Sequence, residues 1–103
     1  MKFENVTLVK KANLYFDGQV NSRTVEFQDG THKTLGIMMP GSYTFGTEAA
    51  EIMEIMAGSC DIKLKGENEF RAIKAGESFD VPAHSSFDIK VHEVTDYCCS
   101  YIQ

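Results

Sequence analysis

Apolar and polar residues alternate strictly in two short segments of the chain. Residues 60–65, CDIKLK, place isoleucine and leucine at every second position, with lysines between and after them. Residues 86–91, SFDIKV, repeat the pattern with phenylalanine, isoleucine and valine. Because successive side chains of a strand point to opposite faces, both segments are predicted to be β-strands with one buried face.

Two other segments are apolar at both parities. These are LGIMM, at the end of the strand-like segment 32–39, and EIMEIM, within the segment 51–57. Strands of this kind are covered on both sides. One cover is a second sheet, and the other is either a partner subunit or the amino-terminal arm. A partner is the simpler explanation, so the sequence predicts a homodimer. The methionines of these segments are expected in the core or the interface.

Further strand-like segments recur along the chain with turn residues between them, at roughly the 8–12-residue spacing of all-β sandwiches and barrels. They are residues 20–27, 69–74, 78–82 and 95–102. No convincing amphipathic helix accompanies them. A double-sheet jelly roll protects the edges of many short strands. We therefore predict an all-β double-sheet jelly roll in one domain, residues 1–103, with residues 1–12 as an arm on the barrel.

Composition limits the partners and the location. The chain has 103 residues and a formal net charge of −5. This acidic balance disfavours nonspecific binding to nucleic acid or to an anionic membrane. No apolar run approaches the roughly 18 residues of a membrane span, and the amino terminus lacks the apolar block of a signal peptide. The expected location is the cytoplasm.

The three cysteines, Cys60, Cys98 and Cys99, have neither the spacing of a zinc site nor an obvious base beside them. They are expected to be reduced, mostly buried small residues rather than nucleophiles.

The spacing of glycine, glutamate and proline resembles the cupin superfamily across residues 41–87. Glu51 is followed by six residues and a glycine, and GESFDVPAHSSF, residues 76–87, keeps the second glycine and the proline. The positions of the cupin metal-binding histidines hold Phe45, Thr47 and Phe87 instead. His84 lies three residues before the last of these positions. Because a divalent metal needs several converging donors, we expect no bound metal.

Five segments spread along nearly the whole chain carry a more specific resemblance: ANLYFDGQV, KTLGIMMPGSYTFGT, EIMEIMAGSCDIKL, AGESFDVPAHSSF and TDYCCSYI. With them the chain is similar to one family of small cupins, the pyrimidine/purine nucleoside phosphorylases. The resemblance implies a metal-free enzyme without a cofactor. It implies cleavage of several purine and pyrimidine nucleosides, with inorganic phosphate as co-substrate, to a free base and a pentose 1-phosphate. The family often has arginine at the position of His32 and glycine at that of Ala83.

Such a reaction needs a carboxylate near the pentose, because its transition state gains oxocarbenium character, and a surface on which a base can lie. Glu51 is the candidate catalytic residue, although a buried glutamate with a purely structural partner is equally compatible with the pattern. The candidate substrate-binding residues are Tyr43, Phe45, Thr47, Phe87 and His84. The aromatic ones would stack on any heterocycle, or simply pack in the core.

Phosphate needs donors or cations. The candidates are His32, Lys33 and Arg23, whereas Arg71 fits a solvated strand face better. Two alternatives to the phosphorylase remain open: a cupin that binds a sugar or nucleoside without changing it, and a metal-dependent cupin enzyme.

Overall fold

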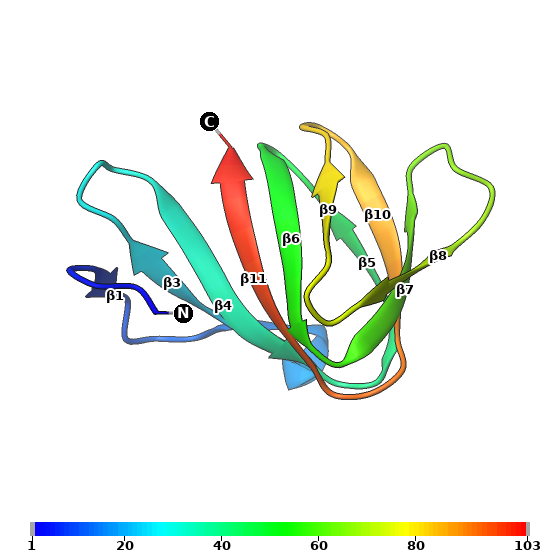
Figure 1. Ribbon diagram of the computed structural model, residues 1–103, viewed down its shortest axis with the longest axis horizontal. Coiled ribbons are helices and arrows are strands. Elements are labelled where there is room, and N and C mark those ends of the chain that lie inside the picture. The colour runs from blue at the N-terminus through cyan, green and yellow to red at the C-terminus, as the bar shows by residue number, and fades with distance from the viewer. Residues whose placement is uncertain (1, 103) are drawn as a thin grey trace.

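Residues 2–102 are described by a computed structural model, in which eleven strands form two facing antiparallel sheets (Figure 1). The larger sheet has the order β1-β3-β4-β11-β6-β9, and β2 pairs with β3 at its edge. The smaller sheet has the order β5-β10-β7-β8. The strands are β1 (Thr7–Leu8), β2 (Asn13–Tyr15), β3 (Val20–Glu26), β4 (His32–Met38), β5 (Gly41–Gly46), β6 (Ala50–Ala57), β7 (Ser59–Leu64), β8 (Arg71–Lys74), β9 (Ser78–Val81), β10 (Ser86–Val91) and β11 (Thr95–Ile102). The predicted all-β, cupin-like fold is confirmed.

The alternating segments behave as predicted. In β10, Phe87, Ile89 and Val91 are buried, and in β7, Ile62 is fully buried. These side chains meet those of the larger sheet in one core between the two layers. Burial of apolar area at about 25 cal/mol per Å² is what holds the layers together.

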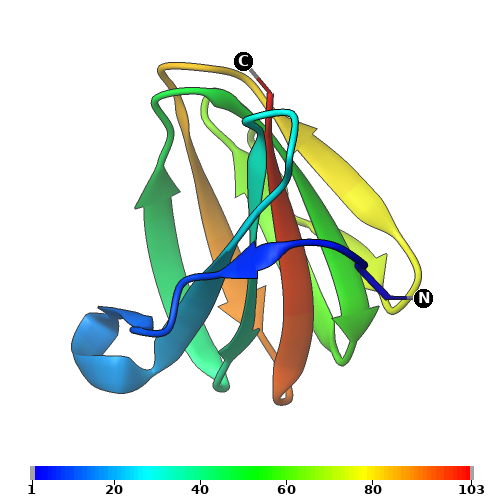
Figure 2. The same cartoon turned by 90° about the vertical axis from the view of Figure 1, so that its left-hand side faces the viewer.

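The amino-terminal arm covers part of the outer face of the larger sheet. It pairs with β3 through β1, and the chain before β1 passes in front of the sheet in the view of Figure 2. The Phe3 ring packs edge-on against Phe27, and the Lys33 ammonium lies 5.6 Å from the centre of the Phe3 ring. The arm leaves Leu35 at 37% and Met56 at 36% exposure. Of the two covers considered for this outer face, a partner subunit or the arm, the arm is present, and it covers the face only in part.

Strand β5 was not among the segments with a recognised strand pattern. It pairs with β10 so that Phe45 lies directly opposite Phe87. This pairing brings two aromatic rings, more than 40 residues apart in sequence, side by side on the inner face of the smaller sheet.

Gly36 lets the larger sheet close tightly around Tyr97. Tyr97 in β11 is the cross-strand neighbour of Gly36 in β4, and its hydroxyl donates to the Asn21 carbonyl oxygen of β3 at 3.1 Å. A Cβ atom on Gly36 would overlap that same oxygen. A residue without a side chain is therefore required here.

The only helix in residues 2–102 is a short 3-10 turn, η1 (Phe16–Gly18), far too short to cross a membrane. Phe16 and Asp17 have positive φ angles of 52° and 55°, which are unfavourable for residues with a side chain. The Phe16 ring packs 5.0 Å from Tyr43 and 5.4 Å from Phe45. These contacts hold the strained turn, and with it the adjacent Tyr15, against the edge of the two sheets.

Candidate functional site

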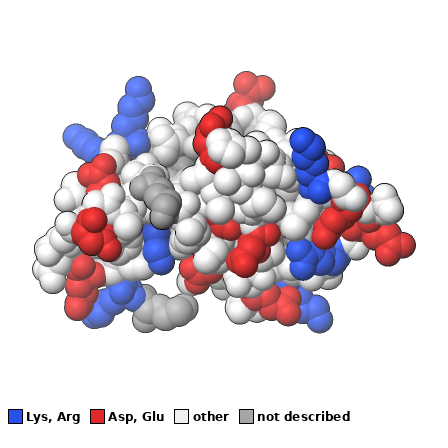
Figure 3. Space-filling model, turned by 90° about the horizontal axis from the view of Figure 1, so that it is seen from above, with Lys and Arg blue, Asp and Glu red and all other residues white. Residues whose placement is uncertain are grey.

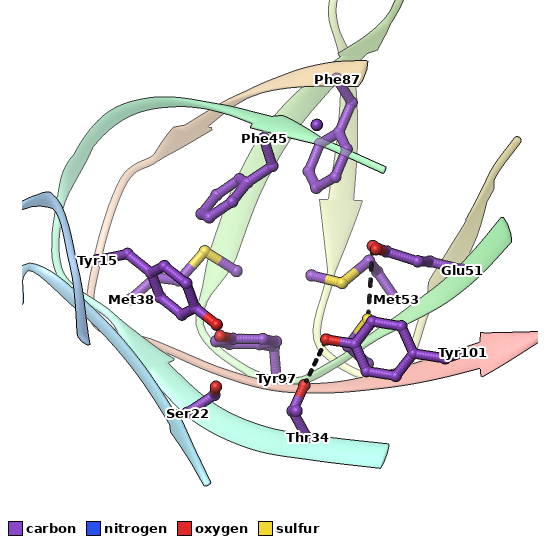
Figure 4. Close-up of a pocket in the computed structure, with 12 residues that line it drawn as sticks. Tyr15, Ser22, Thr34, Met38, Phe45, Glu51, Met53, Phe87, Tyr97 and Tyr101 are labelled. Carbon is purple, nitrogen blue, oxygen red and sulfur yellow. Dashed lines mark hydrogen bonds between the residues drawn. The ribbon is translucent and has the colours of Figure 1, made fainter. Parts of the chain in front are cut away.

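An inner cavity of about 130 Å³ lies between the two sheets (Figure 4). The larger sheet supplies most of its polar groups, and the smaller sheet supplies aromatic rings. The lining residues are Tyr15, Ser22, Thr34, Met38, Phe45, Gly46, Glu51, Met53, Phe87, Tyr97, Cys99 and Tyr101. Hydroxyl groups, one carboxyl group and two phenylalanine rings therefore face the same small space.

Glu51 is the one acidic residue that lines the inner cavity among the described residues. It stands in β6, between Tyr101 of β11 and Val81 of β9. Burial raises the pKa of its carboxyl group, and the Cys99 thiol, which donates to Glu51 Oε1 at 3.5 Å, lowers it by a smaller amount. The cavity thus disfavours the ionised carboxylate. A cationic or hydrogen-bonding partner would stabilise that ionised form.

Phe45 and Phe87 form an aromatic wall opposite Glu51. Their ring centres lie 5.5 Å apart with an interplanar angle of 27°, and Phe79 packs edge-on behind Phe87. Phe87 is 2% exposed, whereas Phe45 is only partly buried. Both rings line the inner cavity, where a heterocyclic ring can lie against them without hydrogen bonds to its polar edge.

A vestibule of about 560 Å³ adjoins the inner cavity. Its residues are Asn13, Tyr15, Thr24, Glu26, Phe27, Gly30, Thr31, His32, Thr34 and Tyr101. Three residues, Tyr15, Thr34 and Tyr101, line both spaces and so mark the junction between them. The His32 ring stacks on Tyr101, with ring centres 4.6 Å apart.

The structure brings together four of the residues singled out from the sequence. Glu51, Phe45 and Phe87 line the inner cavity, and His32 lines the vestibule.

Three other candidate substrate-binding residues line neither space. Tyr43 is buried, and its hydroxyl donates to the Met39 carbonyl oxygen at 2.7 Å. Thr47 donates to the Pro82 carbonyl oxygen at 2.7 Å and accepts from the Ser85 backbone amide, so it joins two loops. His84 is exposed on the turn after Pro82.

Arg23 and Lys33, the other candidate phosphate-binding residues, project from the outer face of the larger sheet. Arg23 Nε donates to the Lys10 carbonyl oxygen at 3.5 Å, and Lys33 lies over the aromatic rings of the arm and of Phe27. The sheet separates both from the cavities. On the molecular face seen in Figure 3, basic and acidic side chains are interspersed.

Sequence analysis missed most of the polar lining. Ser22, Thr34, Tyr97, Tyr101 and Tyr15 were not identified as candidates. The alternation of side chains along β11 could have identified two of them, because Tyr97 and Tyr101 lie on the same inward face as Cys99. No comparable signal existed for Tyr15, which is 40% exposed beside the strained turn.

The three cysteines are free and buried, as predicted. Burial raises the pKa of the Cys60 thiol to about 11 and raises that of Cys99 further. Thiols of this kind stay protonated near neutral pH and are poor nucleophiles. Among residues 2–102, no cluster of three or more His, Cys, Asp or Glu side chains is arranged to hold a metal ion.

Known proteins resemble this chain along nearly its whole length. A family model described as pyrimidine/purine nucleoside phosphorylase matches residues 10–101. A pyrimidine/purine nucleoside phosphorylase from Sulfurimonas denitrificans is 66% identical over 99% of this chain and 98% of its own.

Solved structures carry the same fold. A crystal structure of a protein of unknown function from an Acinetobacter species has a TM-score of 0.95 and 45% identity, with 98% of each chain covered. An RmlC-like cupin from Shewanella frigidimarina has a TM-score of 0.70 and 14% identity, with 98% of this chain and 86% of that one covered.

Proposed function

The chain belongs to the pyrimidine/purine nucleoside phosphorylase family, and from this premise we propose that it cleaves purine and pyrimidine nucleosides with inorganic phosphate. The observation that carries the proposal is the position of Glu51, a half-buried carboxyl group facing the stacked rings of Phe45 and Phe87 across one cavity.

The reaction balances without a cofactor. An oxygen of hydrogen phosphate forms a bond to the anomeric carbon of the pentose, and the bond from that carbon to the base nitrogen breaks. The electron pair stays on the base nitrogen, which takes up the proton that the phosphate carried. The products are a free base and a pentose 1-phosphate. As the bond breaks, the pentose gains positive charge, as in glycoside cleavage.

Glu51 stabilises this charge. A carboxylate in a partly desolvated site interacts with a developing cation more strongly than it would in water. It also accepts hydrogen bonds from the pentose hydroxyls and so fixes the sugar. Burial raises the pKa of Glu51 and so disfavours its ionised form, and the positive charge that develops on the pentose offsets that cost.

The aromatic wall accounts for broad specificity. The Phe45 ring offers dispersion and stacking to any flat heterocycle. No Asn, Gln, Lys or Arg side chain is among the inner-cavity residues that the structure describes. A site that recognises a substrate by hydrogen bonding discriminates strongly, whereas an apolar wall does not.

The inner cavity is smaller than the roughly 300–1,000 Å³ of typical ligand pockets, but together with the vestibule it falls in that range. The nucleoside and phosphate therefore occupy both spaces.

Purified protein is expected to release free base and pentose 1-phosphate from uridine and from adenosine only when phosphate is present. Dialysis against EDTA is expected to leave the rate unchanged, because Phe45 and Phe87 stand where metal-binding cupins have histidines. Chromatography of bases and sugar phosphates measures both. Phosphate-independent hydrolysis or loss of activity with EDTA would refute the proposal. Nucleoside-induced thermal stabilisation without product would favour a non-catalytic binding cupin.

We also propose that the protein is a homodimer through the outer face of the larger sheet, where Leu35 and Met56 are incompletely covered. Light scattering during size-exclusion chromatography is expected to give twice the chain mass of 11.5 kDa, and Leu35→Glu is expected to shift the protein toward the monomer. A wild-type protein that is monomeric at micromolar concentration would contradict this.

A further inference from the structure

We propose that the hydroxyls of Thr34 and Tyr101 bind the attacking phosphate at the junction between the inner cavity and the vestibule. This inference rests on the proposed phosphorolysis and adds the phosphate subsite, which the cations Arg23 and Lys33 cannot form from the outer face of the sheet.

Position is the first argument. Thr34 and Tyr101 line both spaces, so a group bound between them touches the vestibule on one side and the inner cavity on the other. Tyr101 is also the direct cross-strand neighbour of Glu51. A phosphate held at this junction is therefore adjacent to a pentose held by Glu51, as an attack on the anomeric carbon requires.

Hydrogen-bonding capacity is the second argument. The Thr34 and Tyr101 hydroxyl oxygens lie 3.4 Å apart, a loose contact compared with the roughly 2.7–2.8 Å of a good hydroxyl pair (Figure 4). Hydrogen bonds to an anionic oxygen are shorter and about twice as strong as neutral ones. Exchanging this weak mutual contact for two bonds to phosphate is favourable.

The surroundings keep both groups as donors. Burial raises the pKa of the Tyr101 phenol, which stays protonated near neutral pH. His32, stacked on the Tyr101 ring, is the one described side chain lining either space that can carry positive charge. Glu26 is the acidic residue of the vestibule, and it is exposed, so solvent screens its repulsion of an anion.

During the reaction the two hydroxyls keep their protons. They orient the phosphate while one of its oxygens bonds to the anomeric carbon. The electron pair of the broken carbon–nitrogen bond leaves with the base. Thr34 and Tyr101 therefore touch a substrate, and their removal is expected to affect phosphate more than nucleoside.

The test compares Tyr101→Phe and Thr34→Val with Tyr43→Phe. Tyr43 is a matched control, because its buried hydroxyl donates to a backbone oxygen and lines neither space. Each junction variant is expected to raise the KM for phosphate by about tenfold or more, while the KM for uridine changes less than twofold. Thr34→Ser, which keeps the hydroxyl, is expected to restore most of the phosphate affinity.

Calorimetric titration with inorganic phosphate alone separates this inference from the reaction itself. Wild-type protein is expected to bind phosphate and both junction variants to bind it about tenfold more weakly. If wild-type protein binds phosphate this way but does not cleave nucleosides, the proposed function fails and the subsite stands. Variants that fold and retain wild-type phosphate affinity, or that raise only the KM for uridine, would overturn the subsite, as would wild-type protein that binds no phosphate.

Discussion

Replacing Glu51 by glutamine is expected to lower kcat/KM for nucleoside phosphorolysis by about 10²–10³-fold, the usual effect of removing one preorganised electrostatic group. The amide is nearly the same size but carries no charge to oppose the cationic pentose. Glu54→Gln is the matched control, because Glu54 stands in the same strand with its side chain on the opposite face. It is expected to retain wild-type activity.

Glu51→Gln is expected to lower activity but not stability. Burial raises the folded-state pKa of Glu51 above its usual value of 4.5. The stability that this shift contributes is fully present below the unfolded pKa and is lost as the pH rises through the folded pKa. Glu51→Gln is therefore expected to melt at or above the wild-type temperature at pH 7, with the difference disappearing near pH 4. Wild-type activity should also fall on the acid side at a pH above 4.5.

Wild-type activity in Glu51→Gln would assign Glu51 a structural role and remove it from the mechanism. A large loss of stability would show that the carboxylate has an internal partner stronger than the Cys99 thiol.

Replacing Gly36 by alanine is expected to destabilise the fold strongly. The added methyl would overlap the Asn21 carbonyl oxygen and lie 2.9 Å from Ser22 Cα, both backbone atoms of β3. Overpacking typically costs about 1–3 kcal/mol, and a clash with backbone in a central sheet lies at the upper end or beyond. At roughly 4–8 °C per kcal/mol, the melting temperature should fall by about 12 °C or more.

Gly46→Ala is the control for this change. A Cβ on Gly46 meets nothing closer than the Ser85 carbonyl oxygen at 3.9 Å, an ordinary contact. It is expected to alter the melting temperature by only a few degrees, measured by circular dichroism. Equal melting temperatures for Gly36→Ala and wild type would mean that β3 and β4 are not as closely apposed as described.

The strand pattern of this chain was largely predictable. Residues 20–27 and 32–39 contain β3 and β4, because β-branched and apolar residues between turn signals leave few alternatives. Strand β5 was missed because glycines at both ends and an exposed serine and threonine weaken its pattern. Its place is fixed by pairing with β10, a contact between distant segments that local sequence does not encode.

The site was only partly predictable. Glu51 and Phe87 were found because the cupin spacing indicates that their side chains point into the barrel. Arg23 and Lys33 were placed among the phosphate ligands because they are cationic. Both their strands carry apolar residues on either face, so parity did not reveal that the two side chains point outward. The Thr34 and Tyr101 pair depends on the register of β4 with β11, which only the folded structure supplies.

A crystal structure of the Glu51→Gln protein soaked with adenosine and phosphate tests the central claim most directly, because the uncleaved substrates should persist. We expect the base against Phe45, the pentose beside residue 51, and the phosphate within hydrogen-bonding distance of Thr34 and Tyr101. Adenosine whose base does not lie against Phe45, or a metal ion coordinated between the sheets, would contradict this account.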